Sequence, residues 1–333
     1  MVKQNTKKKK MLKGFNNVAI LTSGGDAPGM NPCIRSAVRV GIYHGFAMFG
    51  IYNGYQGLVN GDFDNLTTRN VGGILHLGGT ILGTSRFQDF KKPEVQAEAL
   101  EKLKAFKIDG LIVIGGEGSL RGALDLANQG FPVIGVPATI DNDINLTDYA
   151  IGFDTSVNTV LEAIYKLRDT AKAHRRLIVL ETMGRNTGHI ALTAGVAGGA
   201  EIILTPEHKL SMDEIEDLVE QCFARKKLFT MIVLAEGAGN ARDIAAEISK
   251  RTGHEVSTTV LGYIQRGGTP TAFDNLLASR MGALAIDAFL HGESGMMTSF
   301  LDGKYQLKPI KDVLKKPKEL NSELYELYKI LAM

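Results

Sequence analysis

Tryptophan is absent from the sequence, and cysteine occurs only at Cys33 and Cys222. The two cysteines are far apart and form no CxxC pattern, so reduced thiols in a cytoplasmic protein are the simplest interpretation. No apolar run approaches the ~18–20 residues that a membrane helix needs, so we expect no membrane partner. Repeats of 20–50 residues and evident linkers are also missing, so two lobes would share crossing segments rather than one hinge.

Net charge is small as well, at +2, but it is unevenly distributed. Five lysines within residues 1–10 carry +5, which leaves −3 for the rest of the chain. Those ten residues lack the apolar core of a secretory signal. We therefore expect residues 1–16 to form a basic, flexible and solvated tail, and we expect no nucleic-acid partner.

What the chain does contain is typical of a soluble globular protein with a large core, with 44% hydrophobic and 22% charged residues. A length of 333 residues suggests two lobes. Predicted strands alternate with predicted helices, which indicates a parallel α/β protein. The strands are expected at 18–21, 49–52, 110–114, 132–136, 177–180, 201–204, 229–235 and 260–263, and the helices at 31–44, 94–107, from about 155, 211–227, 241–252, 275–291 and from about 319, with a hairpin at 302–303.

Two glycine-rich turns each join a predicted strand to a helix, at 22–31 (TSGGDAPGMN) and 115–119 (GGEGS). Backbone N–H groups and the helix dipole face one point in such a turn, which predicts an anion site. Neither turn has the P-loop or GxGxxG pattern. A steric need for glycine is the alternative for the first turn. Glu117 suits a hard cation that bridges phosphates, or it is an ordinary acid of a first helical turn.

The segment 137–143 (PATIDND) follows a buried strand and carries Asp141 and Asp143. Carboxylates at the carboxyl end of a parallel strand fall where open α/β sheets bind ligands. A carboxylate fixed there can accept a proton from a hydroxyl group. The alternative is a helix-entry loop that is rich in capping and turn residues.

Arginines and one glutamate stand at the ends of other predicted strands. Arg86 lies among small polar residues, and both a phosphate contact and an ordinary surface charge stay open for it. Arg176 and Arg185 bracket the strand 177–180, and Glu236 follows the strand 229–235. His174 and His189 are expected to be structural or solvent-facing.

Five segments, in order and at family spacing, resemble those of bacterial-type 6-phosphofructokinases over nearly the whole chain. They are SGGDAPGMN at 23–31, GGEGS at 115–119, TIDND at 139–143, MGR at 183–185 and IQRGG at 264–268. The resemblance implies a phosphofructokinase fold of two Rossmann-like lobes with mainly parallel sheets in three αβα layers. It implies an ATP-binding lobe at 17–152 plus 265–315 and a sugar-phosphate lobe at 153–264 plus 316–333.

The same resemblance implies a homotetramer in which Mg²⁺ and ATP phosphorylate fructose 6-phosphate at its 1-hydroxyl. Asp141 would be the base, with Thr139, Asp143 and Arg185 beside it. The residues implied at ATP are Gly25, Tyr55, Arg86, Phe87, Gly116, Glu117, Gly118 and Ser119, with Glu117 as the metal ligand. Those implied at the sugar are Thr139, Ile140, Asp141, Arg176, Met183, Gly184, Arg185, Glu236, Ser257, Tyr263 and Arg266, of which Arg176 would serve a neighbouring subunit.

An effector site for ADP or phosphoenolpyruvate between subunits is also implied. Its matching residues are Arg35, Arg39, Arg168, Glu201, Arg225 and Lys227. From the residues alone, Arg35 and Arg39 would form a solvated helix face. Thr68 and Phe229 replace an Arg and a His of the family pattern, so regulation would be altered.

Outside the effector site, four positions depart from the family pattern. Glu117 replaces an Asp, and its extra methylene moves the carboxylate by roughly 1.5 Å. Ser257 and Tyr263 replace an Arg and a His at the sugar phosphate. Ala138 replaces a Gly, where pyrophosphate-using relatives carry a Lys and have an Asp at the position of Gly118, so Ala138 and Gly118 favour ATP.

These observations predict an ATP-dependent 6-phosphofructokinase. Two alternatives stay open: a diverged kinase for another sugar phosphate, and a non-catalytic, nucleotide-binding regulatory subunit. The departures at Glu117, Ser257 and Tyr263 are the reason for both.

Overall fold

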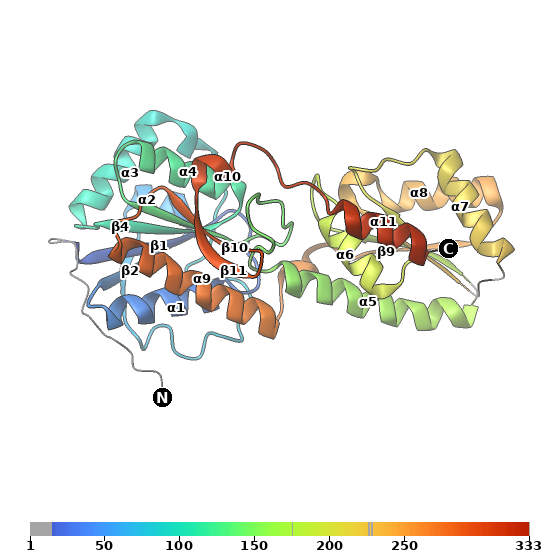
Figure 1. The fold of residues 1–333 in the computed structure, drawn as a ribbon, viewed down its shortest axis with the longest axis horizontal. Helices are drawn as coiled ribbons and strands as arrows, with labels where there is room; N and C mark the ends of the chain where they lie inside the picture. The colour runs from blue at the N-terminus through green and yellow to red at the C-terminus, as the bar shows by residue number, and fades with distance from the viewer. Residues whose placement is uncertain (1–14, 175, 226, 228, 333) are drawn as a thin grey trace.

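Two β-sheets divide the chain into a larger and a smaller lobe, which lie end to end in the computed structural model (Figure 1). The structure describes residues 15–174, 176–225, 227 and 229–332. The seven-stranded sheet of the larger lobe has the order β11-β10-β5-β4-β1-β2-β3. Its strands are β1 (Asn17–Ser23), β2 (Ala47–Ile51), β3 (Phe63–Leu66), β4 (Gly110–Gly115), β5 (Val133–Pro137), β10 (Met296–Leu301) and β11 (Lys304–Pro309).

Helices cover both faces of this sheet, as Figure 1 shows. On one face lie α1 (Met30–Tyr43) and α9 (Ala272–Leu290), whose apolar side chains share a buried cluster with β1 and β5. On the other face lie α2 (Gly54–Asn60), α3 (Pro93–Ala105), α4 (Glu117–Asn128) and the short α10 (Ile310–Val313), around a second cluster. The layers are therefore αβα, as predicted.

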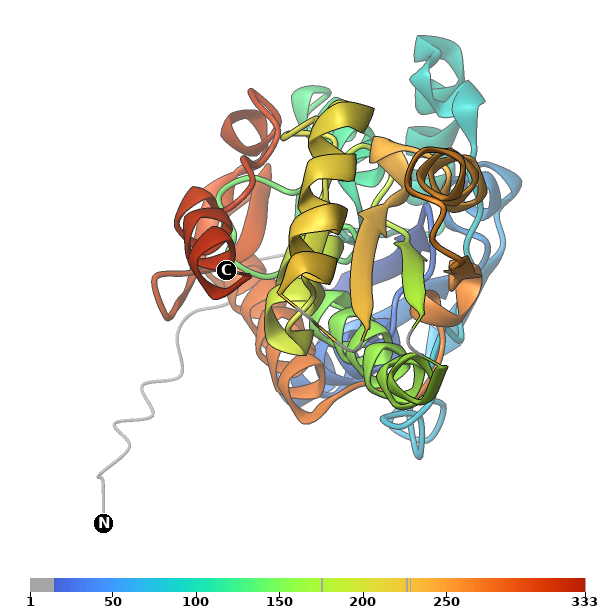
Figure 2. The same ribbon diagram turned by 90° about the vertical axis from the view of Figure 1, so that its right-hand side faces the viewer.

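The smaller lobe repeats this plan around four parallel strands in the order β7-β8-β6-β9. They are β6 (Leu177–Thr182), β7 (Ile202–Leu204), β8 (Thr230–Ala235) and β9 (Val256–Val260). Figure 2 views the molecule from this end, with the helices on both sides of the strands. The helices are α5 (Phe153–His174), α6 (His189–Gly198) and α11 (Ser322–Leu331) on one face, and α7 (Met212–Ala224) and α8 (Ala241–Thr252) on the other.

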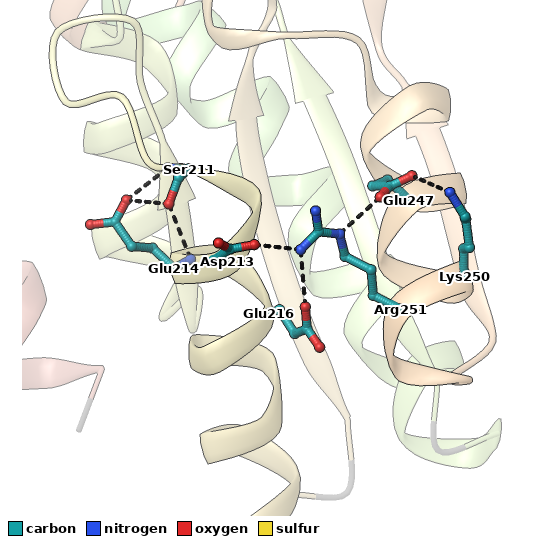
Figure 3. Close-up of polar contacts among 7 residues, drawn as sticks. All are labelled: Ser211, Asp213, Glu214, Glu216, Glu247, Lys250 and Arg251. Atoms are coloured by element: carbon teal, nitrogen blue, oxygen red, sulfur yellow. Dashed lines mark hydrogen bonds and ion pairs between the residues drawn. The ribbon is translucent and has the colours of Figure 1, made fainter.

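The predicted elements of both sheets are mostly confirmed. β4 is fully buried between β1 and β5, as its continuous apolar sequence indicates. The hairpin at 302–303 joins β10 to β11, and both turn residues have positive φ, at 51° and 72°. Ser211 and Glu214 form the capping box that opens α7, and Arg251 of α8 pairs with acids of α7 (Figure 3).

The strand predicted at 260–263 is wrong. The strand here is β9, which ends at Val260, and a 3₁₀-helix η3 (Gly262–Arg266) follows. Gly262 has φ 53°, which breaks the extended conformation. β9 is an edge strand of the described sheet and pairs only with β6. It therefore keeps polar Ser and Thr side chains and has no continuous apolar run.

Further elements escaped prediction, among them the short helices α2 and α10, the helix α6 and the strand β3. Helix α6 is apolar nearly all round, because it is buried against β7, β8 and α5, and it therefore lacks the one-sided stripe of a surface helix. Strand β3 is short, polar and antiparallel to β2 at the sheet edge.

Asp274 is a residue of α9. Its buried carboxylate fixes the junction between the two lobes. It accepts hydrogen bonds from the Gly152 and Thr155 N–H groups at 3.0 and 2.8 Å and from the Thr155 hydroxyl at 2.6 Å. These bonds tie α9 of the larger lobe to the start of α5. Burial nevertheless raises the pKa of Asp274 to about 6.

Cys33 and Cys222 are free and buried, consistent with the expected reduced thiols. Within the part of the chain that the structure describes, no helix combines the length and the apolar character needed to cross a lipid bilayer.

Candidate active site

A cleft of about 730 Å³ lies where loops from both lobes meet. The turns after β1, β4 and β5 form one side, and the loop after β6 contributes Met183 and Arg185. These loops stand at the carboxyl ends of parallel strands, the usual ligand position in open α/β sheets. The cleft therefore collects the two glycine-rich turns and the 137–143 segment that the sequence pointed to.

The first glycine-rich turn is fixed by the segment that leads to Arg86 and Phe87. Gly24 has φ 90°, its N–H group donates to the Ser85 carbonyl at 3.2 Å, and the Thr84 hydroxyl donates to the Gly24 carbonyl at 3.0 Å. Arg86 and Phe87, which follow, therefore line the cleft beside this turn.

The second turn contacts the first directly. The Ser119 hydroxyl donates to the Ser23 carbonyl at 2.9 Å. A Cβ atom on Gly115 would lie 2.5 Å from that same carbonyl, so only glycine allows the approach. Gly116 caps α4 with no side-chain bond to the first N–H groups, and the Ser119 N–H donates to the Gly116 carbonyl at 3.0 Å. The N–H groups of Glu117 and Gly118 are therefore the ones that can bind an anion. A Cβ on Gly118 would meet nothing within 4 Å.

Glu117 is the first residue of α4 and lines the cleft with about half of its side chain exposed. Its carboxylate pairs with Arg121 one turn later, where the Arg121 Nε donates at 3.0 Å. Such an exposed pair is weak, typically ~0.3–0.5 kcal/mol, so another cation can displace the arginine. We did not anticipate Arg121, although its i+4 spacing from Glu117 was visible in the sequence.

Asp141 is 6% exposed and sits in a tightly bonded loop. Its N–H donates to the Thr139 hydroxyl at 3.2 Å, and the Thr187 hydroxyl of the smaller lobe donates to its carbonyl at 3.4 Å. Arg185 Nε lies 3.4 Å from its carboxylate. Asn142, with φ 51°, closes the loop through the Asp148 carbonyl and the Ala150 N–H, at 3.0 and 2.8 Å.

Burial is the main reason that the pKa of Asp141 rises, to about 6, and the neighbouring Asp143 carboxylate adds to it while Arg185 opposes it. The group is therefore ionised at neutral pH yet basic enough to accept a proton. The pKa of Asp143 is also raised, by burial and then by the Glu117 carboxylate. Asp143 Oδ1 is buried and has no hydrogen-bond partner among the described residues.

The loop after β6 is held by Glu236. Its Oε1 accepts from the N–H groups of Gly184 and Arg185 at 3.1 and 2.7 Å. Both donors have positive φ, at 139° and 51°, so the glutamate fixes an unusual backbone. The Met183 N–H donates to the fully buried side chain of Gln265, a residue of the IQRGG segment that we had not placed in the site.

Arg266, the last residue of η3, reaches the first glycine-rich turn. Its Nε lies 3.5 Å from Asp26, and a Cβ on Gly25 would be 1.6 Å from its guanidinium. Gly25 is thus required for this approach, and Arg266 links the two sides of the cleft. Asp26 lies within a quoted motif, but we had given it no role.

Comparison with known proteins identifies the family. A model of the family described as "Phosphofructokinase" matches residues 17–289. The chain belongs to the phosphofructokinase family. It is 49% identical to the ATP-dependent 6-phosphofructokinase of Halalkalibacterium halodurans and 48% identical to that of Shouchella clausii, each over 96% of this chain and the whole of the relative.

Solved phosphofructokinases share the fold. The Saccharomyces cerevisiae structure superposes with a TM-score of 0.84 at 33% identity over 90% of this chain, and the Pichia pastoris structure with 0.86 at 32% over 95%. This chain spans 45% and 38% of those two yeast chains. The predicted phosphofructokinase fold and family are therefore confirmed.

Most residues that the family resemblance implies at ATP line this one cleft. Tyr55 differs from them because its side chain is buried and bonded to the protein. It is 4% exposed, it stacks on Phe90 with ring centroids 4.0 Å apart, and its hydroxyl donates to the Ser119 carbonyl at 2.7 Å. Because this bond occupies the hydroxyl, Tyr55 supports the second glycine-rich turn and is poorly placed to hydrogen-bond a nucleotide.

Two residues implied at the sugar, Gly184 and Glu236, are bonded to each other and do not line the cleft themselves. Three more, Arg176, Ser257 and Tyr263, also lie outside its lining. Arg176 precedes β6 at the end remote from the cleft and pairs with Glu255 at 2.8 Å, while Ser257 stands next to Ile178 in the register of β9. The Tyr263 side chain is 78% exposed. Within one chain Arg176, Ser257 and Tyr263 do not meet Asp141.

The residues implied at the effector site fall into two separate groups. Arg35 and Arg39 lie on α1 of the larger lobe, whereas the other four lie around β7 and the far end of α5 in the smaller lobe. There Glu201 pairs with Lys227 at 3.5 Å, Arg168 donates to the Gly199 carbonyl at 2.8 Å, and Arg225 donates to the Ala332 carbonyl at 3.2 Å. A single chain does not bring the two groups together.

Proposed function

We propose that this protein is an ATP-dependent 6-phosphofructokinase in which Asp141 is the general base. The observation that carries the proposal is the placement of a buried carboxylate with raised pKa in the same cleft as two contacting glycine-rich turns. Phosphoryl transfer needs a positioned acceptor and charge stabilisation more than it needs covalent catalysis by the protein. The family and the 49% identical relative support the same reaction.

In this mechanism the 1-hydroxyl oxygen of fructose 6-phosphate forms a bond to the γ-phosphorus of ATP. The bond between that phosphorus and the β–γ bridging oxygen breaks, so ADP leaves. Asp141 accepts the hydroxyl proton. Arg185, 3.4 Å from Asp141, orients the base and lies where it can neutralise the transferring group.

The N–H groups of Gly25, Gly116, Glu117 and Gly118 hold the phosphates of ATP, while the Ser119 N–H is bonded to the Gly116 carbonyl. The open space at Gly118 favours ATP over pyrophosphate, because a side chain there would occupy the cleft. Phe87 and Arg86 lie on the other side of the cleft, where the rest of the nucleotide would bind.

The residues present fit a magnesium ion brought in with ATP. The Glu117 carboxylate contributes to the raised pKa of Asp143 across the cleft, and Asp143 Oδ1 is buried without a hydrogen-bond partner among the described residues. Among the described residues no group of three or more His, Cys, Asp or Glu side chains could hold a metal ion by itself. This suits Mg²⁺, which binds one or two carboxylates together with phosphates and water. When bound, the ion would offset charge on the β- and γ-phosphates.

We also infer that the sugar half is completed in a homotetramer. Arg176, Ser257 and Tyr263 lie outside the cleft of their own chain, and Tyr263, Ile264 and Leu276 expose 78, 61 and 60% of their surfaces. Exposed apolar residues of this size favour a subunit interface. The two groups of basic residues on α1 and near β7 would likewise meet only between subunits, which supports an anionic effector such as ADP or phosphoenolpyruvate.

The same proposal assigns residues 17–152 plus 265–315 to ATP and 153–264 plus 316–333 to the sugar phosphate, in a cytoplasmic enzyme. The test is a coupled assay of the purified protein with ATP or pyrophosphate and a panel of phosphosugars. We expect formation of fructose 1,6-bisphosphate from ATP and fructose 6-phosphate. A markedly higher kcat/KM for another sugar phosphate would favour a diverged kinase, and nucleotide binding without any product would favour a regulatory subunit.

A further inference from the structure

The last segment that crosses between the lobes, residues 314–321, joins α10 to α11 (Figure 1). It lies against the loop that carries Asp141 and Asp143, through its residue Lys318. None of the five family segments includes Lys318, and it does not line the cleft.

Lys318 contacts both ends of the loop 143–148. Its backbone N–H donates to the Asp143 carbonyl at 3.4 Å, and its ammonium group donates to the Asp148 carbonyl at 2.6 Å. The same Asp148 carbonyl accepts the Asn142 side chain at 3.0 Å. Asn142 stands between the two aspartates in a left-handed conformation, so this shared carbonyl fixes the backbone that aims Asp141.

Lys318 also meets the smaller lobe. His189, the first residue of α6, is 6% exposed and lies close enough to Lys318 for the backbone and the charge of that lysine to affect its pKa. Burial lowers the pKa of His189 to about 4, and the Lys318 charge contributes, so the imidazole is neutral at physiological pH. Helix α6 follows directly after the loop with Met183 and Arg185, so Lys318 connects the base loop to the sugar loop.

The ammonium group carries charge as well as hydrogen bonds. Burial lowers the pKa of Lys318 to about 8, while the carboxylates of Asp148 and Asp143 oppose this shift. Asp143 Oδ1 is buried and has no hydrogen-bond partner among the described residues, so the ammonium group reaches the loop through the Asp148 carbonyl.

We infer that Lys318 is a positioning residue of this active site, whose backbone and ammonium group hold the Asp141–Asp143 loop in register with the sugar loop of the smaller lobe. The inference rests on the proposed function, since its main effect is on phosphoryl transfer. Lys318 itself does not touch the reacting atoms. It acts through Asp143, Asn142 and Asp148.

Three substitutions separate the features of the side chain: Lys318→Arg keeps charge and donors, Lys318→Gln keeps a donor, and Lys318→Met keeps neither. Because a displacement of about 1 Å can cost ~10²-fold, we expect Lys318→Met to lower kcat about 10- to 100-fold. Both KM values should stay within about threefold, because the ligand contacts remain. Lys318→Arg should recover most of the activity, and Lys318→Gln should lie between.

The matched control is Lys316→Met, two residues earlier on the same segment, where the side chain is 63% exposed and pairs with Glu319. It should leave kcat unchanged. A merely structural lysine would instead give variants that lose thermal stability but keep wild-type kcat in the folded fraction, and that result would overturn the inference.

A double-mutant cycle tests the route through the Asp148 carbonyl that Lys318 shares with Asn142. If Lys318 acts through that shared carbonyl, Lys318→Met should lower kcat much less in an Asn142→Gly background, which keeps the left-handed backbone, than in the wild type. Equal loss in both backgrounds would contradict the stated route.

Amide hydrogen exchange tests the positioning role without any turnover. Peptides that cover 141–150 should exchange faster in Lys318→Met than in Lys316→Met. Unchanged exchange there would overturn the inference even if the protein had no kinase activity. Wild-type protein that makes no sugar bisphosphate, but shows this faster exchange, would contradict only the proposed function.

Discussion

In the proposed function, one half of the cleft binds the nucleotide and the other half binds the sugar phosphate. A single chain supplies more of the nucleotide half than of the sugar half. The nucleotide half is built within the larger lobe, where the two glycine-rich turns are bonded to each other and to the 84–85 segment. The sugar half holds Met183, Arg185 and Arg266, but Arg176, Ser257 and Tyr263 lie elsewhere on the chain.

This difference has a physical reason. A phosphate chain is bound by backbone N–H groups and glycine-lined space, which one βα turn provides locally. A sugar phosphate needs several long charged side chains that converge from different elements, and in the tetramer that we propose some of them come from a second subunit. Substitutions in the nucleotide half should therefore change mainly the KM for ATP, and substitutions in the sugar half should change mainly the KM for the sugar phosphate.

The largest effect should come from Asp141→Asn, which belongs to both halves. Loss of a general base typically costs 10²–10⁴-fold, so kcat should fall by about that factor. Binding of Mg-ADP, measured by calorimetry, should stay within about twofold, because the glycine-rich turns are intact. Turnover within tenfold of wild type would remove Asp141 from its role.

Ser257→Arg should strengthen binding of the sugar phosphate and leave binding of ATP unchanged. If fructose 6-phosphate is the substrate and a neighbouring subunit supplies this position, a new charged hydrogen bond of ~1.5–3 kcal/mol should lower the sugar KM by about 10-fold or more. The KM for ATP should not change. Steady-state kinetics in both substrates measure this.

The control for that experiment is Thr258→Arg, which places the same charge on the opposite face of β9, where the side chain is exposed. It should not lower the sugar KM. Equal effects of the two arginines would point to general electrostatic attraction rather than to a phosphate site.

Gly118→Ala should affect only the nucleotide half. The added methyl group meets no protein atom within 4 Å and projects into open space, so folding should be unaffected or slightly favoured, since alanine is the better helix former. In the complex the methyl would crowd the nucleotide, and we expect the KM for ATP to rise about tenfold, of the order that overpacking costs. An equal rise in the KM for the sugar phosphate would contradict the division of the cleft into a nucleotide half and a sugar half.

The smallest effect should be a change in how kcat depends on pH, measured at saturating sugar for Arg185→Lys and Arg185→Met. The base must be ionised, so wild-type kcat should fall as pH drops through about 6. Arg185 lowers the pKa of Asp141, so its removal raises that pKa and moves the acid limb to higher pH. Arg185→Met should therefore lose more activity at pH 6 than at pH 8, whereas Arg185→Lys should stay close to wild type.

Sequence patterns predicted the regular core of this molecule well. Continuous apolar runs marked β4 and β5 as buried parallel strands, and the SxxE pattern at 211–214 marked the start of α7. They failed where tertiary position changes the usual pattern. The edge strand β9 is polar because one of its sides has no neighbouring strand, and α6 has no polar face because the smaller lobe encloses it.

The sequence by itself determined the chemistry that this protein carries: two glycine-rich anion turns, a pair of aspartates after a buried strand, and the arginines around them. Those features depend on local geometry, which short segments specify. Only the tertiary structure decided which groups act together. It gave Tyr55 and Glu236 supporting roles, paired Glu117 with Arg121, and brought Lys318 against a loop some 170 residues earlier in the chain. Contacts between remote segments depend on how the lobes pack, and no local pattern encodes them.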